Sequence, residues 1–407
     1  FDRVISDCEA AVALKPDKIE AMLLCTQARI LKQDYKKALI DIAKAIEIEP
    51  NSARAHNLKG LIRYHLNEDN AALKDLLKSL EIHHKFEEAH FNIARVYKKQ
   101  NKIKEAMSHL NDAIKNKPDY YDAYVERSEL LEMTGDIKSA ITDLNVLIRM
   151  NSSEYTFYLR RSKYKKMLRD FKGAMQDLEI TMKFPDLSEE VFFQMGDLLM
   201  IDKKYTEAIS FFDKAIGINK KHEGSWLQRG IAKYNNGNNA GAIEDFTSLI
   251  QINSENFPAY YHRAKAKMKL ADNYGAMVDF TKALTDLNYY DAFMARAKLK
   301  IQQNDHHSAV MGLSKAIQLK QDSVRAIFLR ANAYIILEKH SEAYEDLNKV
   351  LMLKPDDPEA LLLRGQSNYY LRQYKNAQSD LEKAIELRPD METQAKPILN
   401  ELKKKLG

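Results

Sequence analysis

Residues 226–249 read WLQRGIAKYNNGNNAGAIEDFTSL, and the fold can be inferred from this segment. A large aromatic residue, Trp226, is followed four residues later by Gly230, then twelve residues later by Ala242, with Phe246 four further on. The polar break NNGNN separates the two halves of the stretch. The same template fits again when it is shifted by 34 residues in either direction. A fixed period of this length indicates a repeat architecture rather than separate globular domains.

The repeat occurs eleven times in full. The repeats begin at residues 19, 53, 87, 121, 155, 189, 223, 257, 290, 324 and 358. Ten of them have 34 residues, and the one that begins at 257 has 33. Each holds two apolar-periodic segments of helical length, joined by a polar break. The array is therefore expected to cover residues 19–391.

The two ends of the chain differ from a complete repeat. Residues 1–16 match the second helix of a truncated leading repeat, with Val4, Cys8 and Ala11 on the face that we expect to pack. Part of the natural N-terminus is expected to be missing, because the chain begins with Phe1. Residues 392–407 lack the repeat columns and read as a C-terminal capping helix, which a solenoid needs at its end.

Three columns of the internal alignment predict how the two helices of a repeat pack. The eighth position is always small, the twentieth is alanine in all eleven repeats, and the twenty-fourth is large and apolar. Gly230, Ala242 and Phe246 fill these columns in the stretch quoted above. The eighth and twentieth positions are nearly equidistant from the turn, so they should face each other across an antiparallel helix pair. Small residues there allow the two backbones to approach closely.

At this point the chain resembles the tetratricopeptide repeat family. The repeat length, the small–alanine–large ladder and prolines such as Pro50, Pro118 and Pro389 match the pattern of that family over residues 1–391. The resemblance implies an all-α fold, a right-handed α-solenoid of helix hairpins whose first helices line a concave groove. It does not identify the individual protein.

The seventh position departs from the family pattern, which has an apolar residue there. It is arginine in most repeats, while the twenty-third position is usually aspartate, and the two columns vary together. We therefore expect an ion pair inside each repeat that fixes its two helices; the alternative is coincidence in a surface column. Arg296 is the exception, because it faces Gly312. The expected pairs are Arg127–Asp143, Arg161–Asp177, Arg229–Asp245, Arg263–Asp279, Arg330–Asp346 and Arg364–Asp380.

The first helices carry apolar and basic residues at the positions that the resemblance assigns to the groove. Such a mixture suits an acidic, amphipathic segment of a partner protein. The alternatives are that the apolar residues pack against their neighbours and that the charges form a solvated face. The expected groove residues are Phe91, Arg95, Lys98, Lys99, Lys163, Lys166, Tyr234, Tyr261, Lys265, Met268, Lys269, Lys298, Phe328 and Tyr369.

The composition argues against most other functions. The net charge of +5 is small beside 63 basic and 58 acidic residues, so nucleic-acid binding is not favoured. Cys8 and Cys25 do not make a disulfide framework, which favours a reducing, cytoplasmic setting. No phosphate loop, nucleophile elbow or metal-ligand motif occurs, so we expect no enzyme activity, cofactor, metal site, small-molecule substrate or membrane insertion.

The sequence thus predicts a non-catalytic scaffold that binds an extended or helical segment of one or more partner proteins within a larger complex. The analogy with long arrays of this kind points to a ciliary, cytoskeletal, transport or cell-cycle assembly. Two alternatives stay open. One is an RNA-binding helical repeat, and the other is a regulatory array attached to a catalytic domain in a missing N-terminal part.

Overall fold

The computed structural model describes residues 1–285 and 289–406, which form two compact bodies, Phe1–Leu187 and Ser188–Gly407. The helices of the N-terminal body are α1 (Asp2–Leu14), α2 (Ile19–Leu31), α3 (Tyr35–Ile48), α4 (Ala53–His65), α5 (Asp69–Ile82), α6 (Glu87–Lys99), α7 (Ile103–Asn116), α8 (Tyr121–Thr134), α9 (Ile137–Met150), α10 (Tyr155–Met167) and α11 (Phe171–Thr181).

The C-terminal body is built in the same way. Its helices are α12 (Glu189–Ile201), α13 (Tyr205–Ile218), α14 (Glu223–Asn235), α15 (Asn239–Ile252), α16 (Phe257–Lys269), α17 (Asn273–Ala283), α18 (Tyr290–Gln302), α19 (His306–Leu319), α20 (Val324–Ile336), α21 (His340–Leu353), α22 (Pro358–Tyr370), α23 (Tyr374–Leu387), the 3₁₀ turn η1 (Pro389–Met391) and α24 (Glu392–Leu406).

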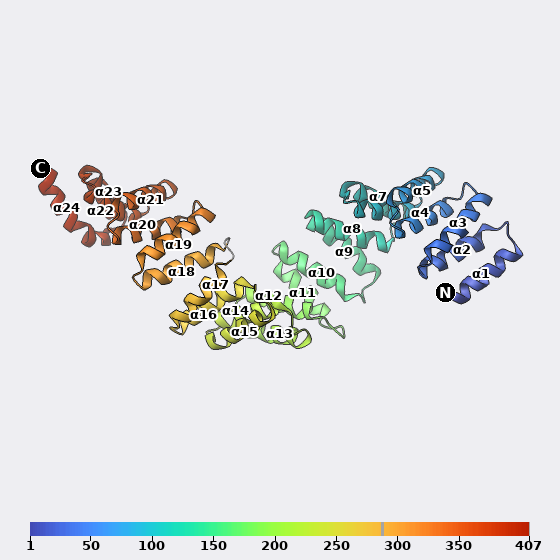
Figure 1. Cartoon of the computed structure of the whole chain (residues 1–407), viewed down its shortest axis with the longest axis horizontal. Coiled ribbons are helices and arrows are strands. Elements are labelled where there is room, and N and C mark those ends of the chain that lie inside the picture. Colours follow the sequence, from blue (N-terminus) through green and yellow to red (C-terminus); the bar gives the residue numbers. More distant parts are fainter. Residues whose placement is uncertain (286–288, 407) are drawn as a thin grey trace. The chain divides into compact units, whose positions relative to one another are not determined.

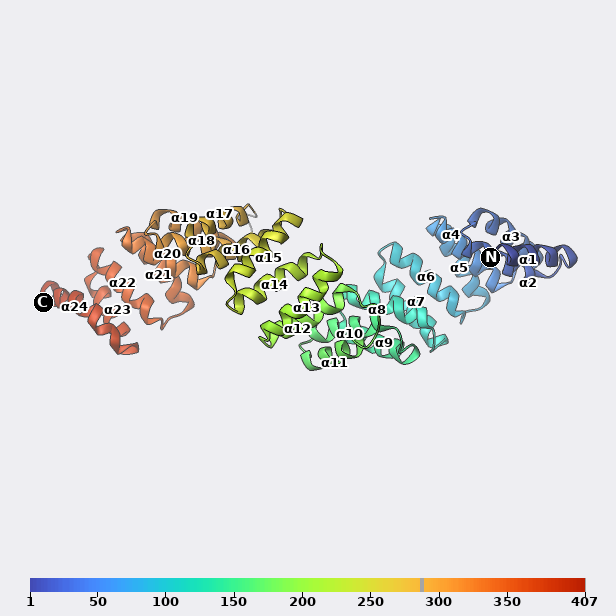
Figure 2. The ribbon, with the colours of Figure 1, turned by 90° about the horizontal axis from the view of Figure 1, so that it is seen from below.

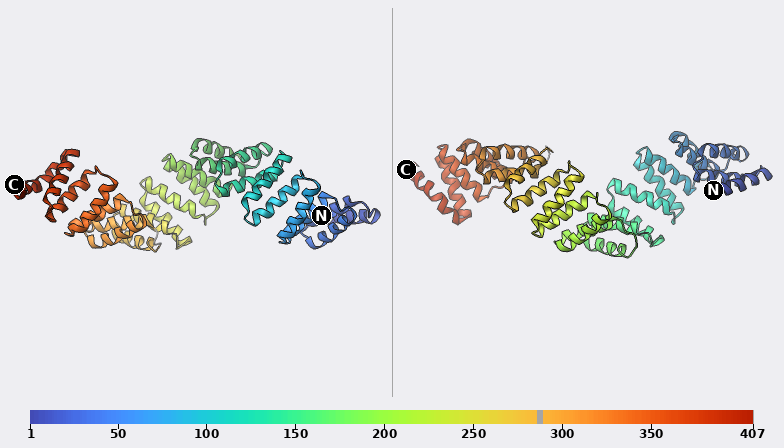
Figure 3. Two further views of the ribbon diagram at one scale, coloured as in Figure 1. Left: turned by 90° about the horizontal axis from the view of Figure 1, so that it is seen from above. Right: turned by 60° about the horizontal axis from the view of Figure 1, so that its bottom comes forward.

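Successive helices form antiparallel pairs, beginning with α2 and α3 and ending with α22 and α23 (Figure 1). Within each body one pair stacks on the next (Figure 2), and Figure 3 shows the same stacking from two further directions. In the part of the chain that the structure describes there is no β-strand. The prediction of an all-α solenoid of helix hairpins is confirmed.

The closest contact inside a pair is made by the small residue of the first helix. A Cβ atom at Gly60 would lie 2.5 Å from Leu76 Cγ and 3.1 Å from the carbonyl oxygen of Ala72. At Gly230 it would lie 2.5 Å from the ring of Phe246. The eighth position is therefore pressed mainly against the large residue at the twenty-fourth position and, where a leucine stands there, against the backbone at the twentieth.

The two apolar columns of the second helices form the core of every pair. The alanine column is fully buried, with 0% exposure at each of its eleven positions, and the large apolar column is at most 1% exposed. The large apolar column consists of Ile42, Leu76, Leu110, Leu144, Leu178, Phe212, Phe246, Phe280, Leu313, Leu347 and Leu381.

The turn between the two helices of a pair has one recurring backbone feature. The fifteenth residue of every repeat has a positive φ, between 57° and 86°. Only two of these residues are glycine, although this region of φ favours glycine. These residues are Gln33, Asn67, Asn101, Gly135, Arg169, Lys203, Gly237, Ala271, Asn304, Glu338 and Arg372.

The two terminal helices pack on one side only. In α1, Cys8 is 5% exposed and Ile5 and Val12 are partly buried, whereas Val4 is 42% exposed and Ala11 is also exposed. The expectation that Val4 and Ala11 pack is therefore wrong, because the buried stripe runs through Ile5, Cys8 and Val12.

At the other end, α24 covers the last helix pair. Leu402 is 1% exposed, and Ile398 and Leu399 pack against the cluster that contains Leu381.

We expect Gly230→Val to lower the free energy of unfolding by about 1–3 kcal/mol, because the new side chain would overlap the ring of Phe246. Gly217→Ala is the matched control: a Cβ there meets no atom within 4 Å, and a glycine inside a helix costs about 0.5–1 kcal/mol relative to alanine. Urea unfolding of both variants measures the difference. Equal stabilities would contradict the close contact.

Candidate functional site

The seventh-position arginine of a repeat holds two helix pairs together. Arg229 donates from Nε and Nη2 to the two carboxylate oxygens of Asp245, at 2.9 and 2.7 Å. Its Nη1 donates at 2.5 Å to Asp213, which belongs to the preceding repeat. The side chains of Arg229 and Asp245 are 14% and 3% exposed. A single guanidinium thus joins α14 to α15 and both to α13.

Five further repeats have the same arrangement. In each, Arg Nη2 lies 2.6 or 2.7 Å from the aspartate within its own repeat. In each, Nη1 also donates to a side-chain oxygen of the preceding repeat, at 2.6 to 3.0 Å. These partners in the preceding repeats are Asn111, Asn145, Thr247, Ser314 and Asn348.

Trp226 supports this arginine. The Arg229 guanidinium carbon lies 4.7 Å from the centre of the Trp226 ring, and the indole nitrogen donates to the carbonyl of Lys220 at 2.8 Å. Tyr124 and Tyr260 take the same place beneath Arg127 and Arg263. The single tryptophan therefore has a structural role, because a cation over an aromatic face is attracted to it.

A second cation from the eleventh position completes the cluster in several repeats. Lys233 lies 3.0 Å from Asp245, Lys267 lies 2.8 Å from Asp279, and Arg63 lies 2.7 Å from Asp75. Two repeats have neither arginine nor aspartate in the two columns, and one of them has a histidine contact instead, between His90 and His109 at 3.1 Å. In these repeats the ion-pair column is thus a structural device.

Most of the basic residues that we expected to line the groove in the N-terminal body form ion pairs within the chain. Lys98 pairs with Glu126 at 2.6 Å and Glu129 at 2.8 Å. Lys99 pairs with Asp69, and Lys163 with Glu132. Arg95 lies over the rings of Tyr64 and Phe91. Lys166 also interacts with another residue of the chain. Lys98, Lys99 and Lys163 therefore offer little uncompensated charge to a partner.

Two further expected groove residues are covered by neighbouring helices. Phe328 packs against the cluster that contains Leu347 and Leu361. Tyr369 donates its hydroxyl to Glu401 of α24, and Lys405 lies 4.7 Å from the centre of its ring. The C-terminal helix thus occupies the surface that Tyr369 would present.

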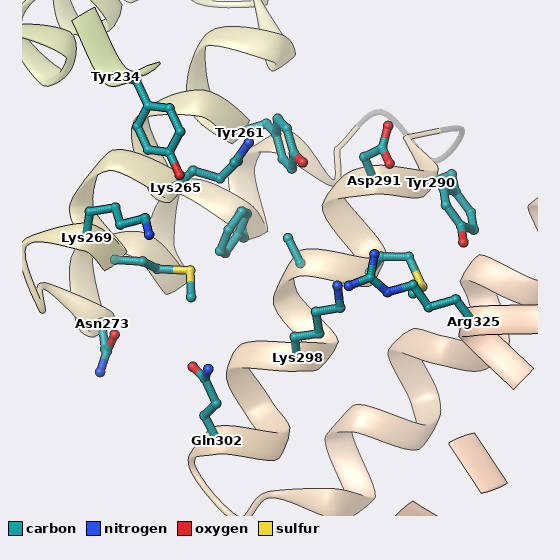
Figure 4. Close-up of a pocket in the computed structure, with 14 residues that line it drawn as sticks. Tyr234, Tyr261, Lys265, Lys269, Asn273, Tyr290, Asp291, Lys298, Gln302 and Arg325 are labelled. Carbon is teal, nitrogen blue, oxygen red and sulfur yellow. The ribbon is translucent and has the colours of Figure 1, made fainter. Parts of the chain in front are cut away.

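The other six expected residues come together around one cavity of about 610 Å³. We call this site the basic groove, and it lies on α14, α16, α17, α18 and α20. Figure 4 shows Lys265 between the rings of Tyr234 and Tyr261, and Lys298 pointing toward Arg325. The basic groove is lined by Tyr234, Tyr261, Lys265, Met268, Lys269, Asn273, Phe280, Tyr290, Asp291, Met294, Ala295, Lys298, Gln302 and Arg325.

The electrostatics of the basic groove differ from those of the N-terminal body. Burial lowers the pKa of Lys265, which Asp291 partly offsets. Burial and the neighbouring Arg325 lower the pKa of Lys298. Among the described residues, no carboxylate lies within ion-pair distance of the four cations Lys265, Lys269, Lys298 and Arg325. Asp291 is the one carboxylate in the lining, so the site has an excess of positive charge.

Sequence reasoning missed several residues of this site. Asp291 and Arg325 occupy the second position of their repeats, which the resemblance assigns to the groove, so the signal was present. Asn273 and Phe280 come from α17, a second helix, and no position rule for first helices finds them. Phe280 reaches the cavity because it belongs to the large apolar column of its own repeat.

Other kinds of site are not seen in the described residues. In residues 1–285 and 289–406, no three histidine, cysteine or acidic side chains gather to hold a metal ion. None of the helices described there has both the length and the apolar character that a membrane span requires.

We expect removal of one ion-pair partner to destabilise the C-terminal body. Arg229→Met should lower the free energy of unfolding by about 3 kcal/mol, because Asp245 is left buried with Lys233 alone. A double-mutant cycle with Asp245→Asn should give a coupling of about 1 kcal/mol or more. Arg296→Met, which breaks no ion pair, should cost less than about 1 kcal/mol. Zero coupling, or equal losses at Arg229 and Arg296, would contradict the structural role.

We also expect the C-terminal body to lose stability in acid through His262. Burial between Phe246 and Tyr261, with Lys265 nearby, lowers the pKa of this imidazole to about 4. The unfolded chain binds its proton near pH 6.5, so the contribution is complete above that pH and is lost as the pH falls from about 6.5 to 4.

The melting midpoint of wild type and of His262→Gln should be measured across this range. The difference between them should shrink as the pH falls, because only wild type has the buried imidazole. A difference that does not change with pH would contradict the assignment.

Comparison with known proteins agrees with the repeat pattern. The family model described as tetratricopeptide repeat matches residues 87–120, 189–222, 324–357 and 358–391, and each match coincides with one 34-residue repeat. A comparison with curated proteins found no match.

Several solved structures resemble the chain. The C-terminal part of a TPR repeat-containing protein from Cytophaga hutchinsonii is 21% identical over 58% of this chain and 97% of that one, with a TM-score of 0.48. A tetratricopeptide repeat protein from Parabacteroides merdae is 18% identical over 57% of this chain and 92% of that one, with a TM-score of 0.45. A chain of the APC/C hetero-tetramer Cut9–Hcn1 is 13% identical over 98% of this chain and 92% of that one, with a TM-score of 0.43.

The 34-residue helix hairpins and the four family matches lead to one conclusion. The chain contains tetratricopeptide repeats, a type of repeat that generally serves as a scaffold for protein–protein interaction.

Proposed function

We propose that this protein is a non-catalytic scaffold whose basic groove binds an acidic, amphipathic segment of a partner protein. The observation that carries the proposal is the charge of the groove. Four cations, Lys265, Lys269, Lys298 and Arg325, surround one cavity without a carboxylate in ion-pair distance among the described residues, whereas Lys98, Lys99 and Lys163 of the N-terminal body each have one.

The desolvation of these cations favours an anionic ligand. Lys265 and Lys298 are held partly out of water, and burial lowers the pKa of both. A carboxylate placed beside them would restore the favourable interaction that they lack, because charge-assisted hydrogen bonds are the strong ones. In the N-terminal body the same repeat position is occupied by Lys163, whose amine already lies 2.9 Å from Glu132.

The rest of the lining suits apolar side chains. Met268, Met294 and Phe280 also line the cavity, and methionine adapts its shape to different partners. The tyrosine rings of Tyr234 and Tyr261 add rigid surface with a polar end. A cavity of about 610 Å³ is large enough for one or two side chains of a partner. Together these features support a segment in which acidic and apolar residues alternate.

The length of the array supports membership of a larger assembly. One short acidic segment needs the four first helices α14, α16, α18 and α20, which leaves the remaining helix pairs for other contacts. We propose a cytoplasmic setting, in keeping with two buried, unpaired cysteines. By analogy with other long arrays, a ciliary, cytoskeletal, transport or cell-cycle complex fits this role.

Crosslinking mass spectrometry of the native complex tests the proposal. The crosslinks from Lys265, Lys269 and Lys298 should converge on one acidic segment of one partner protein. The double variant Lys265→Met/Lys298→Met should then bind that partner at least about tenfold more weakly, since close interfacial charge pairs couple by about 1.5 kcal/mol or more. Lys163→Met, at the same repeat position but already paired, is the matched control and should bind as wild type does.

Two outcomes would overturn the proposal. One is that partner crosslinks arise only from the second helices. The other is that loss of binding is the same for Lys163→Met as for the double variant. If ribonuclease treatment abolished the crosslinks from the groove lysines, the ligand would be RNA and not an acidic protein segment.

A further inference from the structure

Arg296 lacks the aspartate partner that arginines at the same repeat position have in other repeats. It occupies the seventh position of the pair α18–α19, and Gly312 stands where eight other repeats have an aspartate, six of them opposite an arginine. In those repeats the guanidinium makes two parallel hydrogen bonds with that carboxylate, as Arg330 does with Asp346 at 2.8 and 2.7 Å. No hydrogen bond or ion pair joins Arg296 to another residue in the described part of the chain.

The second cation of the cluster forms an ion pair with a different carboxylate in this repeat. The eleventh position is Lys300, which corresponds to Lys233 and Lys267 in the preceding repeats. Those lysines lie 3.0 and 2.8 Å from the aspartate of their own repeat. Lys300 instead pairs with Asp305 in the turn, at 2.9 Å. Arg296 is therefore left without the aspartate and without the second cation that complete the cluster in other repeats.

The pKa values of the two arginines also differ between the paired Arg330 and the unpaired Arg296. The hydrogen bonds that Arg330 donates to Asp346 raise the pKa of Arg330, whereas burial alone lowers the pKa of Arg296. The charged guanidinium of Arg296 is thus partly desolvated without an anion to compensate it.

A cavity of about 530 Å³ opens beside this guanidinium. It lies on α17, α18 and α19, and none of its lining residues carries a carboxylate. Lys315 adds a second positive charge, and Met311 is 73% exposed at the opening. The lining residues are Thr281, Leu284, Thr285, Phe293, Arg296, Met311, Gly312, Lys315, Gln318 and Leu319.

This Arg296 cavity is distinct from the basic groove. Both use α18, but Met294 and Lys298 line the basic groove, while Phe293 and Arg296 line the Arg296 cavity. The two cavities share no lining residue. A ligand of one therefore leaves the other open.

We propose that the Arg296 cavity binds an aspartate side chain of a partner polypeptide, which takes the place of the carboxylate missing at Gly312. The incoming carboxylate accepts two parallel hydrogen bonds from the Arg296 guanidinium, as the internal aspartates do in the other repeats. An apolar neighbour of that aspartate packs on Leu284, Phe293 and Met311. The positive charge of Arg296 and Lys315 selects the acid over its amide.

The test uses two short probe peptides, acetyl-Leu-Asp-Leu-amide and acetyl-Leu-Asn-Leu-amide, titrated into the full chain labelled with ¹³C at the methionine methyl groups. The Met311 methyl signal should shift to saturation with the aspartate peptide. The asparagine peptide should bind at least about tenfold more weakly, as expected when a bidentate charged contact is lost. A third peptide, acetyl-Leu-Leu with a free terminal carboxylate, should also bind more weakly than the aspartate peptide.

Two variants of the glycine provide the matched control. A Cβ at residue 312 would lie 3.5 Å from Ala297 Cβ, which is an ordinary contact, so both Gly312→Asp and Gly312→Ala should fold. Gly312→Asp supplies the missing carboxylate from inside and should abolish the Met311 shift while raising the melting midpoint above that of Gly312→Ala. Gly312→Ala should bind the aspartate peptide within about twofold of wild type, and Arg296→Met should not bind it.

The proposal is overturned if the aspartate and asparagine peptides bind alike, if Gly312→Asp binds as well as Gly312→Ala, or if no peptide shifts the Met311 signal. Preference for the peptide with the free terminal carboxylate would overturn the assignment to an aspartate side chain. None of these results depends on the basic groove, because Lys265→Met/Lys298→Met should leave the Met311 titration unchanged.

Discussion

The stacking of this protein depends on one charged side chain that contacts three helices. Arg229 makes two hydrogen bonds with Asp245 in its own helix pair and a third with Asp213 in the pair before it. The same contacts recur in five further repeats of the two bodies, so in each of these repeats one arginine joins the two helices of a pair and connects that pair to the preceding one. Small residues bring the helices close enough for this, since a Cβ at Gly230 would already overlap Phe246.

The same interaction relates structure to function through its exceptions. Where an arginine or lysine has a carboxylate within the chain, it stabilises the solenoid and has little charge left for a ligand. Where the carboxylate is missing, a partly desolvated cation remains beside an open cavity, as at Lys265, Lys298 and Arg296. The small net charge of +5 hides this difference, because it averages over paired and unpaired residues.

Much of the fold is predictable from the sequence because the packing columns repeat. The fully buried alanine column and the large apolar column are visible as fixed spacings, so the helix pairs follow from them. The positive φ in the turn inside each repeat cannot be predicted from the residue type, because residues as different as Arg169, Ala271 and Glu338 adopt it. There the closure of the hairpin dictates the backbone, and the residue type only adds to its cost.

The candidate site was less predictable. Column reasoning places Lys98 and Lys163 in the same class as Lys265, but carboxylates of neighbouring repeats pair with the first two and not with the third. Such contacts depend on side-chain positions across repeats, which one column does not show. The third hydrogen bond of Arg229 was missed for the same reason, because its partners are chemically mixed: aspartate, asparagine, threonine and serine.

The most direct measurement of this account is the exchange of the arginine Nε protons with water, followed by NMR in the free full-length chain. Arg229, Arg263, Arg330 and Arg364 serve as internal references, because each donates Nε–H to its aspartate at 2.8 or 2.9 Å. The account predicts slow exchange at these four and fast exchange at Arg296. Exchange at Arg296 as slow as at the four paired arginines would contradict it.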